Sequence, residues 1–201
     1  FINFKKPPKF RTDEVALNME QVEKIYKHDF SKNRKLEKVR DLFVFGCTTG
    51  MRFGNYSKIT KNDIQGDFIR VIDLKSKSKN LSIPLNPISK KILEKYEYNL
   101  PAISNQKMNE YIKEVFKELE FTDEIKKTMK YGDELVYQSS AFWKRISSHT
   151  ARRSFITIMK NKRVPDKVIM SYTGHTSLEV FNTYYRPSEE DKVNYMNEVF
   201  K

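Results

Sequence analysis

The segment from Ser148 to Lys162 places the strongest constraint on the fold. Its apolar residues recur at roughly helical spacing, which predicts a helix with one face against a core; they are Phe155, Ile156, Ile158 and Met159. His149 and Arg152 stand three positions apart, so on a helix they lie about one turn from each other on the same face. This pair suits a phosphate, because arginine donates two parallel N–H bonds to the oxygens and histidine adds a donor or takes up a proton. Alone, such a pair is more often a solvated surface feature, so its meaning depends on the rest of the chain.

The charge balance favours a polyanionic partner. The chain of 201 residues has 38 Lys and Arg against 26 Asp and Glu, a formal net charge of +12 that fits binding to nucleic acid or to an anionic membrane surface. An apolar content of 38% supports a buried core, and no continuous apolar run is long enough to span a bilayer. The single cysteine, Cys47, excludes a disulfide framework and predicts a buried thiol in an intracellular protein.

Helices dominate the predicted secondary structure. Caps and apolar spacing predict them at 18–28, 36–47, 86–98, 104–119, 149–162, 166–172, 178–185 and 188–201. Two antiparallel hairpins are expected between them, one from strands 68–74 and 81–85 and the other from strands 124–130 and 134–138. The sequence therefore predicts a mainly α protein with small antiparallel β-hairpins, an α+β arrangement.

Several separated pieces of sequence carry groups that suit a phosphate. Arg52 follows a Gly turn at the end of a predicted helix, where it is either held at the edge of the core or caps the helix. A lysine-rich run lies at the tip of the first hairpin, and its ordinary interpretation is a solvated turn. Further along, Gly174-His175 precedes Tyr184 by nine residues, counted from the histidine. Each piece alone is unspecific.

Taken together in this order, these pieces resemble the tyrosine recombinase, or phage integrase, family. The matching motifs are Thr49-Gly50-Met51-Arg52, a lysine in a β-hairpin, His149-Thr150-Ala151-Arg152, Gly174-His175 and Tyr184. The resemblance covers about residues 18–201, and the wording around His149 is most similar to integrases of mobile elements in Bacteroides-type bacteria. It implies the tyrosine recombinase catalytic-domain fold, which is the fold of DNA breaking-rejoining enzymes.

The resemblance also implies a set of catalytic residues, namely Arg52, Lys75, His149, Arg152, His175 and Tyr184. In that set the two arginines clamp the oxygens of a DNA phosphate, and each well-placed donor is worth about 3 kcal/mol in the transition state. The lysine protonates the leaving 5′-oxygen, the histidines hold phosphate oxygens and manage protons, and the tyrosine becomes linked to the 3′-phosphate. A free phenol has a pKa of about 10, so the nucleophile needs cationic neighbours or a base.

No cofactor or metal is implied, because the covalent intermediate stores the energy of the broken bond. The acidic residues are scattered, and three histidines with one cysteine make a zinc site improbable.

Some positions depart from the family pattern or leave a choice open. The family usually has an acidic residue three positions after the first arginine, and Asn55 stands there, with a supporting role expected. Counted back from Ile83-Pro84, the family's lysine position falls on Ser76, so Lys75 is the first choice for the hairpin lysine and Lys77 the second. Tyr185 lies beside Tyr184, and spacing favours Tyr184 as the nucleophile. Arg153 is expected to be a surface residue or a contact to the phosphate backbone.

The domain organisation follows from composition and resemblance together. Residues 1–17 begin with a basic segment that contains prolines, and they are predicted to be a linker or strap from a preceding DNA-binding domain. Residues 18–201 are predicted to be the catalytic domain. The resemblance implies double-stranded DNA as partner, a homotetramer for the full-length enzyme and a monomer for this part alone. The last helix suits docking on a neighbouring protomer and packing against its own protomer equally well. We expect a bacterial cytoplasmic, nucleoid-associated protein without a membrane partner.

The function predicted is site-specific DNA recombination, the integration or excision of a mobile element. Two alternatives stay open at this point. One is a DNA-binding regulatory module that has lost activity, which is disfavoured because every expected reactive residue type is present. The other is a relaxing enzyme of the type IB topoisomerase kind, which the bacterial appearance of the motifs disfavours.

Overall fold

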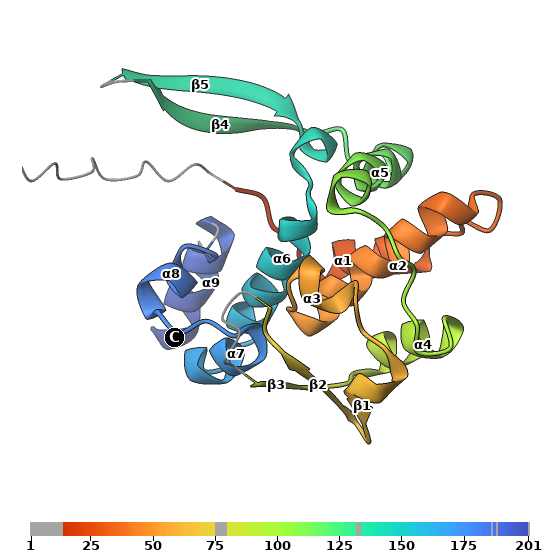
Figure 1. The fold of residues 1–201 in the computed structure, drawn as a ribbon. Coiled ribbons are helices and arrows are strands. Elements are labelled where there is room, and N and C mark those ends of the chain that lie inside the picture. The colour runs from red at the N-terminus through yellow and green to blue at the C-terminus, as the bar shows by residue number, and fades with distance from the viewer. Residues whose placement is uncertain (1–13, 75–79, 132–133, 186, 188, 201) are drawn as a thin grey trace, which may run out of the picture.

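A computed structural model of the chain describes residues 14–74, 80–131, 134–185, 187 and 189–200. The long helix α2 (Arg34–Thr49) runs through the core, and α1 (Met19–Lys27), α4 (Pro87–Lys95), α5 (Asn105–Glu118) and α6 (Ser148–Asn161) pack around it (Figure 1). Its residues from Val39 to Cys47 are all buried, which includes the charged pair Arg40 and Asp41 among otherwise mostly apolar residues. The mainly α class with small antiparallel sheets is confirmed.

The C-terminal end of α2 delivers the first arginine motif. Gly50 ends the helix in the left-handed region with φ of 67°, and its N–H donates to the carbonyl of Gly46. A Cβ at Gly50 would lie 2.4 Å from Cδ1 of Phe155 on α6, so both the backbone angle and the close packing require glycine. The chain then turns at Arg52, the N-cap of the short helix α3 (Phe53–Tyr56).

The first predicted hairpin is part of a three-stranded antiparallel sheet. The short 3-10 helix η1 (Lys61–Asp63) leads into β1 (Ile64–Gln65), which pairs with β2 (Phe68–Ile72), and β2 pairs with β3 (Asn80–Pro84). The hairpin of β2 and β3 is confirmed, whereas β1 was not predicted, because two residues are too short to display an alternating pattern. Lys75 and Lys77, the candidates for the hairpin lysine, lie between β2 and β3 and outside the described residues.

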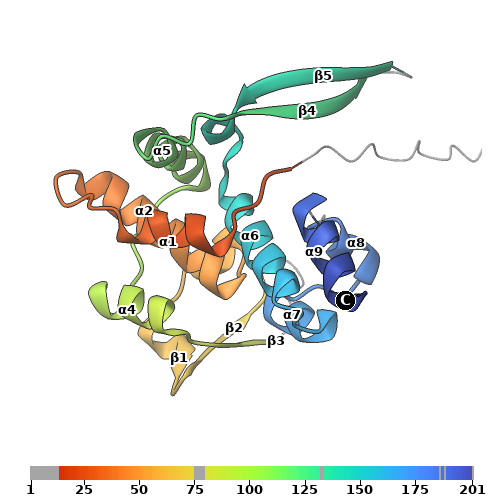
Figure 2. The ribbon, with the colours of Figure 1, turned by 180° about the vertical axis from the view of Figure 1, so that it is seen from behind.

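The second predicted hairpin is longer than expected. Strands β4 (Glu124–Tyr131) and β5 (Glu134–Ala141) pair along their whole length, from Glu124 with Ala141 to Tyr131 with Glu134. The hairpin projects away from the helical body (Figures 1 and 2). The 3-10 helix η2 (Phe142–Arg145) returns the chain to α5 and α6.

The C-terminal part forms a second, smaller core. Phe155, Ile156, Ile169 and Phe181 cluster there, contributed by α6, α7 (Asp166–Thr173) and α8 (Leu178–Asn182). The prediction of a helix over 178–185 was wrong at its C-terminal end, because α8 stops at Asn182. The Thr183 hydroxyl donates to the Val180 carbonyl at 2.7 Å, a local bond that competes with continuing the helix.

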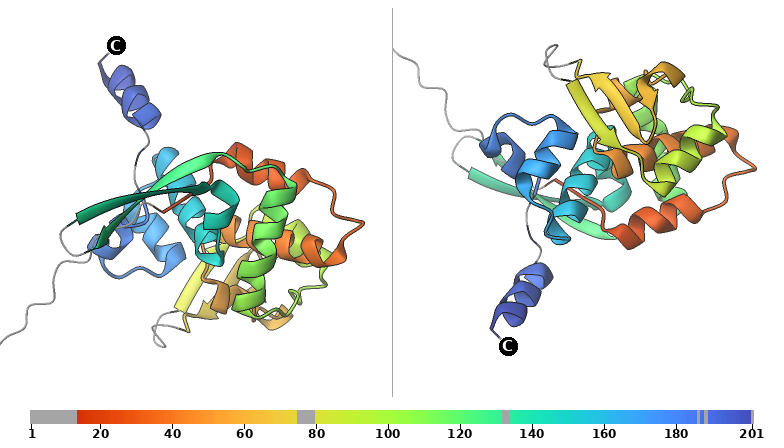
Figure 3. Two further views of the ribbon diagram at one scale, coloured as in Figure 1. Left: turned by 90° about the horizontal axis from the view of Figure 1, so that it is seen from above. Right: turned by 90° about the horizontal axis from the view of Figure 1, so that it is seen from below.

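The last helix, α9 (Glu189–Val199), lies at the side of the molecule (Figure 3). It is attached through Asn161, whose side chain donates to Asp191 and whose carbonyl accepts a bond from the Tyr195 hydroxyl. Its apolar stripe is largely exposed, with Met196 at 61% and Phe200 beyond the helix at 76%. No helix among the described ranges is long and apolar enough to cross a membrane.

Residues 14–17, the described part of the predicted linker, pack onto the helical body. Val15 and Leu17 are buried in the main core, and the Leu17 N–H donates to the Ser154 hydroxyl on α6 at 2.9 Å. The capping box of Asn18 and Gln21, which was predicted, then starts α1. The packed unit therefore extends from α1 back to residue 14, while residues 1–13 lie outside the described part of the chain.

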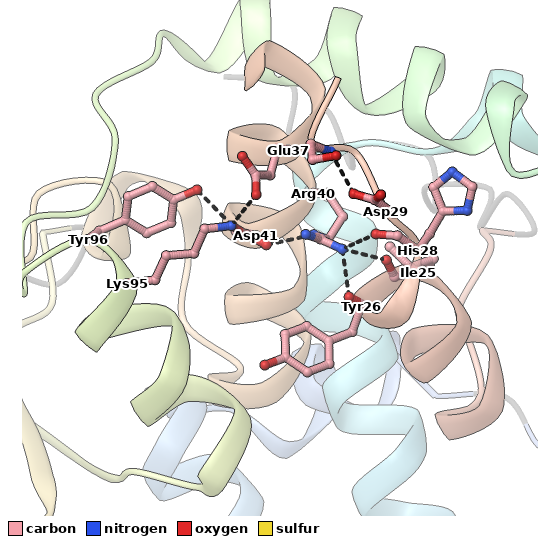
Figure 4. Close-up of polar contacts among 10 residues, drawn as sticks. Ile25, Tyr26, His28, Asp29, Glu37, Arg40, Asp41, Lys95 and Tyr96 are labelled. Atoms are coloured by element: carbon pink, nitrogen blue, oxygen red, sulfur yellow. Dashed lines mark hydrogen bonds and ion pairs between the residues drawn. The ribbon is translucent and has the colours of Figure 1, made fainter. Parts of the chain in front are cut away.

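A buried cluster of charges ties α1, α2 and α4 together (Figure 4). Arg40 Nη1 donates to the carbonyls of Ile25, Tyr26 and His28 at the C-terminal end of α1. Asp41, which is 1% exposed, accepts bonds from Arg40 Nε at 2.6 Å and from Lys95 and the Tyr96 hydroxyl, both at 2.7 Å. Burial and the bond to Asp41 raise the pKa of Tyr96 well above its usual value. Lys95 Nζ also donates to Glu37 Oε1 at 2.6 Å, so two carboxylates of α2 balance Arg40 and Lys95, and the cluster joins three helices.

We predict that Asp41→Asn lowers the free energy of unfolding by about 3 kcal/mol, because the Arg40 guanidinium stays buried without its carboxylate. Urea unfolding followed by circular dichroism measures the change. Asp67→Asn is the matched control, since its pair with Lys90 is exposed to solvent and should contribute little. Equal effects of the two substitutions would contradict the prediction.

Candidate functional site

The start of α6 is anchored so that its first turn faces the site. Ser147 caps the helix in a capping box with Thr150. The Ser148 N–H donates to Asn109 at 2.7 Å and its hydroxyl to Asn105 at 2.8 Å, which ties this turn to α5. Because residues 149 and 152 share a helix face, the anchored turn sets the positions of both side chains. His149 lies at the surface and Arg152 is buried.

Arg152 is the buried centre of the site, with 1% of its surface exposed. Its Nη1 donates to the Gly50 carbonyl at 2.9 Å, and its Nη2 lies 3.2 Å from both ring nitrogens of His175. Burial, together with the nearby charge of Arg52, lowers the pKa of Arg152 to about 10, so the guanidinium stays protonated at neutral pH. Arg152 therefore joins the end of α2 to the turn after α7.

Arg52 is held by the carboxylate of Asp73, a residue that none of the sequence motifs includes. Arg52 Nη1 donates to Asp73 Oδ2 at 2.8 Å, and Asn55 Nδ2 donates to Asp73 Oδ1 at 3.0 Å. Asn55 Oδ1 also accepts a hydrogen bond from the Leu74 N–H at 3.2 Å, which fixes the residues that follow β2 beside α3. Asp73 is 1% exposed. An isolated acid directly after the apolar strand 68–72 was the signal in the sequence that could have identified it.

The Gly174-His175 motif is a tight turn packed on the sheet. Gly174 has φ of 72°, and a Cβ there would lie 3.1 Å from Leu81 Cδ2 and 3.6 Å from Asp73 Oδ2. His175 follows, 6% exposed, with Nδ1 2.9 Å from the Thr173 hydroxyl and its ring against Phe181. The turn thus brings the histidine between the sheet and α6.

Tyr184 lies in the turn after α8 and faces this cluster. Its hydroxyl lies 3.0 Å from Nε2 of His149, and its ring centroid lies 4.8 Å from that of His175. The guanidinium carbon atoms of Arg152 and Arg153 lie 5.8 and 5.5 Å from the ring centroid. Both arginines are within cation–π range of the ring.

Tyr185 points elsewhere. Its hydroxyl donates to Asn161 near the C-terminal end of α6 at 2.9 Å. Burial, with a hydrogen bond to Tyr195, raises the pKa of Tyr185 well above its usual value. The two adjacent tyrosines therefore have opposite surroundings, and only Tyr184 contacts the predicted site residues among those described.

Five of the six predicted site residues converge in the structure, namely Arg52, His149, Arg152, His175 and Tyr184. The sixth, Lys75, and the second choice, Lys77, lie outside the described residues. Within the described ranges, no three His, Cys, Asp or Glu side chains gather in a way that could hold a metal ion.

Several solved structures with a similar fold are recombinases and integrases. The XerA recombinase superposes with a TM-score of 0.65 at 14% identity, over 96% of this chain and 66% of that one. The Tn1549 transposon integrase in complex with transposon right end DNA superposes with a TM-score of 0.62 at 14% identity, over 100% of this chain and 69% of that one. The lambda integrase dimer bound to a core site superposes with a TM-score of 0.61 at 17% identity, over 89% of this chain and 60% of that one. A search of curated proteins found no match.

The fold is therefore that of tyrosine recombinase catalytic domains. The model of the phage integrase family matches residues 16–191, so the chain belongs to the phage integrase family. The chain spans 66% of the XerA recombinase chain and 60% of the lambda integrase chain to which it is similar.

We predict that sulfate stabilises the protein through the two arginines. Arg52 and Arg152 repel each other, and a tetrahedral dianion between them offsets that repulsion. Sulfate well above its dissociation constant should raise the melting temperature by about 3 °C relative to sodium chloride of equal ionic strength. Differential scanning calorimetry measures the shift.

Arg52→Gln should abolish most of this gain. Arg70→Gln, which removes an equal charge from an exposed position on β2, should leave it intact. A sulfate effect of the same size in all three proteins would contradict specific binding between the arginines.

Proposed function

We propose that this chain is the catalytic domain of a site-specific DNA recombinase that cleaves and rejoins DNA strands through Tyr184. The observation that carries the proposal is the Tyr184 hydroxyl 3.0 Å from His149 Nε2, beside the buried Arg152 guanidinium. A phenol next to an imidazole, in a site with two fixed arginines, suits nucleophilic attack on a phosphodiester. The net charge of +12 supports DNA as the partner.

In the proposed reaction the Tyr184 oxygen attacks phosphorus in line with the 5′-oxygen of the next deoxyribose. A bond forms between the phenolic oxygen and phosphorus, the bond to the 5′-oxygen breaks, and the DNA 3′-phosphate stays on the tyrosine. His149 takes the phenolic proton, and Lys75 or Lys77 gives a proton to the leaving oxygen. Attack by a 5′-hydroxyl on the phosphotyrosine reverses these steps and joins the strand, so no net oxidation or hydrolysis occurs.

The arginines and His175 stabilise the transition state of this reaction. Arg52 and Arg152 donate to the non-bridging oxygens, on which negative charge accumulates. Asp73, braced by Asn55, fixes Arg52, while the Gly50 carbonyl and His175 fix Arg152. Such donors cost no reorganisation during reaction, because neighbouring groups already orient them.

The proposal extends to partners and domain organisation. The whole enzyme acts as a homotetramer on two DNA duplexes, with residues 1–17 linking to a DNA-binding domain and residues 18–201 forming the catalytic domain. It integrates or excises a mobile element at the nucleoid in the bacterial cytoplasm. The DNA present in the lambda and Tn1549 integrase structures supports the choice of partner.

The test begins with a pool of nicked duplexes that have a randomised centre. Cleavage at a nick lets the short strand diffuse away, which traps the covalent complex as a slow band in denaturing electrophoresis. Sequencing the trapped DNA identifies a site, and that duplex becomes the substrate for the variants.

We predict that Tyr184→Phe abolishes the covalent band, whereas Tyr185→Phe retains it, because only Tyr184 faces the arginines. Tyr184→Phe should still shift the duplex in a native gel. A native shift without any covalent band from the unmodified chain would support the inactive binding module instead. Relaxation of supercoiled plasmid without any strand exchange between two duplexes would support the relaxing enzyme.

A further inference from the structure

Arg153 lies beside the proposed nucleophile, and neither the motifs nor the proposed reaction uses it. It follows Arg152 on α6, and one helical turn separates it from His149 on the same face. The sequence predicts a surface residue or a contact to the phosphate backbone at this position, and the side chain is 14% exposed. Its guanidinium carbon lies 5.5 Å from the ring centroid of Tyr184, closer than that of Arg152.

The second observation is that the segment before α1 reaches Arg153. This segment runs beside α6 (Figure 2), and its Leu17 N–H donates to Ser154, the residue after Arg153. Glu14 Oε2 lies 3.9 Å from Arg153 Nη1. Glu14, Leu17, Arg153 and Tyr184 line one cavity of about 400 Å³, together with the first turn of α9.

Tyr184 needs support of this kind because of its place in the chain. Helix α8 ends at Asn182, and the Tyr184 N–H donates to Phe181 at 3.0 Å in the turn that follows. A turn after a short helix restrains a side chain less than the interior of a helix does. The direction of the phenol is therefore set by side chains around its ring, with His149 at the hydroxyl, His175 on one side and the arginines of α6 on another.

We propose that Arg153 positions Tyr184 for attack, and that Glu14 holds Arg153 in place for this role. The segment before α1 thereby acts on the nucleophile. It is held on α6 by the bond between Leu17 and Ser154, which are 137 residues apart in sequence. This inference rests on the proposed function, since it assumes that Tyr184 is the nucleophile. Arg153 contacts the ring and not the scissile phosphate, so it is a positioning residue.

The test separates the rate of the covalent step from DNA affinity. The probe is the nicked duplex selected above, at a concentration that saturates the protein, and the readout is the first-order rate of covalent band formation. Loss of a cation from an aromatic ring in a half-buried site should slow this step about tenfold in Arg153→Gln. The dissociation constant of the duplex and its dependence on salt should stay unchanged.

Arg153→Lys should recover most of the rate, because it returns a cation to the ring, whereas a purely structural role would gain nothing specific from lysine. Arg163→Gln is the matched control, since Arg163 lies over the ring of Tyr195 on α9 and should react at the rate of the unmodified chain. Glu14→Gln, at a position with 43% side-chain exposure, avoids a folding defect and should slow the step by a smaller factor. It should add nothing in the Arg153→Gln background.

Two outcomes would overturn the proposal. If Arg153→Gln weakens DNA binding, reduces the salt slope by about one and leaves the saturated rate unchanged, Arg153 is a contact to the phosphate backbone. If Glu14→Gln and Arg153→Gln act additively, the segment before α1 does not act through Arg153. Failure of the proposed function is distinct from both, because the unmodified chain would then form no covalent band, or the band would persist in Tyr184→Phe.

Discussion

The burial of Arg152 is the constraint on which the site depends. A guanidinium with 1% exposure is stable only when its surroundings satisfy it, and Gly50 and His175 lie at the ends of two different helices. The turn after α2 and the turn after α7 must therefore meet at α6. This meeting also brings Arg52 and Asp73 to the same place, since Asp73 lies beside Gly174. Like charges held close together in this way favour an anion between them.

Tyr184, the proposed nucleophile, is positioned differently from the arginines. Arg52 and Arg152 are fixed by the hydrogen bonds that they donate to groups on adjoining elements, whereas Tyr184 follows a five-residue helix and is surrounded by rings and guanidinium groups. In the proposed function, the rigid part of the site binds the phosphate, and a less constrained turn carries Tyr184, the group proposed to attack it. The segment at residues 14–17 packs on α6 beside this turn, which is the basis for the proposed action of Glu14 on Tyr184 through Arg153.

Local patterns in the sequence predicted most elements correctly. The capping box of Asn18 and Gln21, the Gly turn at Gly50 and the alternation in β2 and β3 involve neighbouring residues, so the sequence displays them directly. The prediction failed for the end of α8, which stops at Asn182, where the Thr183 hydroxyl bonds to the Val180 carbonyl. Asp73 was missed because its partners, Arg52 and Asn55, lie 18 or more residues away and belong to another element.

By itself the sequence determined the kinds of groups in the site and their order, because the motifs and the spacing from His175 to Tyr184 are linear features. It also determined the basic charge and the mainly helical class. Only the tertiary structure decided that Tyr184 and not Tyr185 faces the arginines, that Arg152 is buried, and that Arg153 lies over the nucleophile. These outcomes depend on how α6, α7 and the turn after α8 pack together, and packing between distant segments leaves no local pattern in a chain.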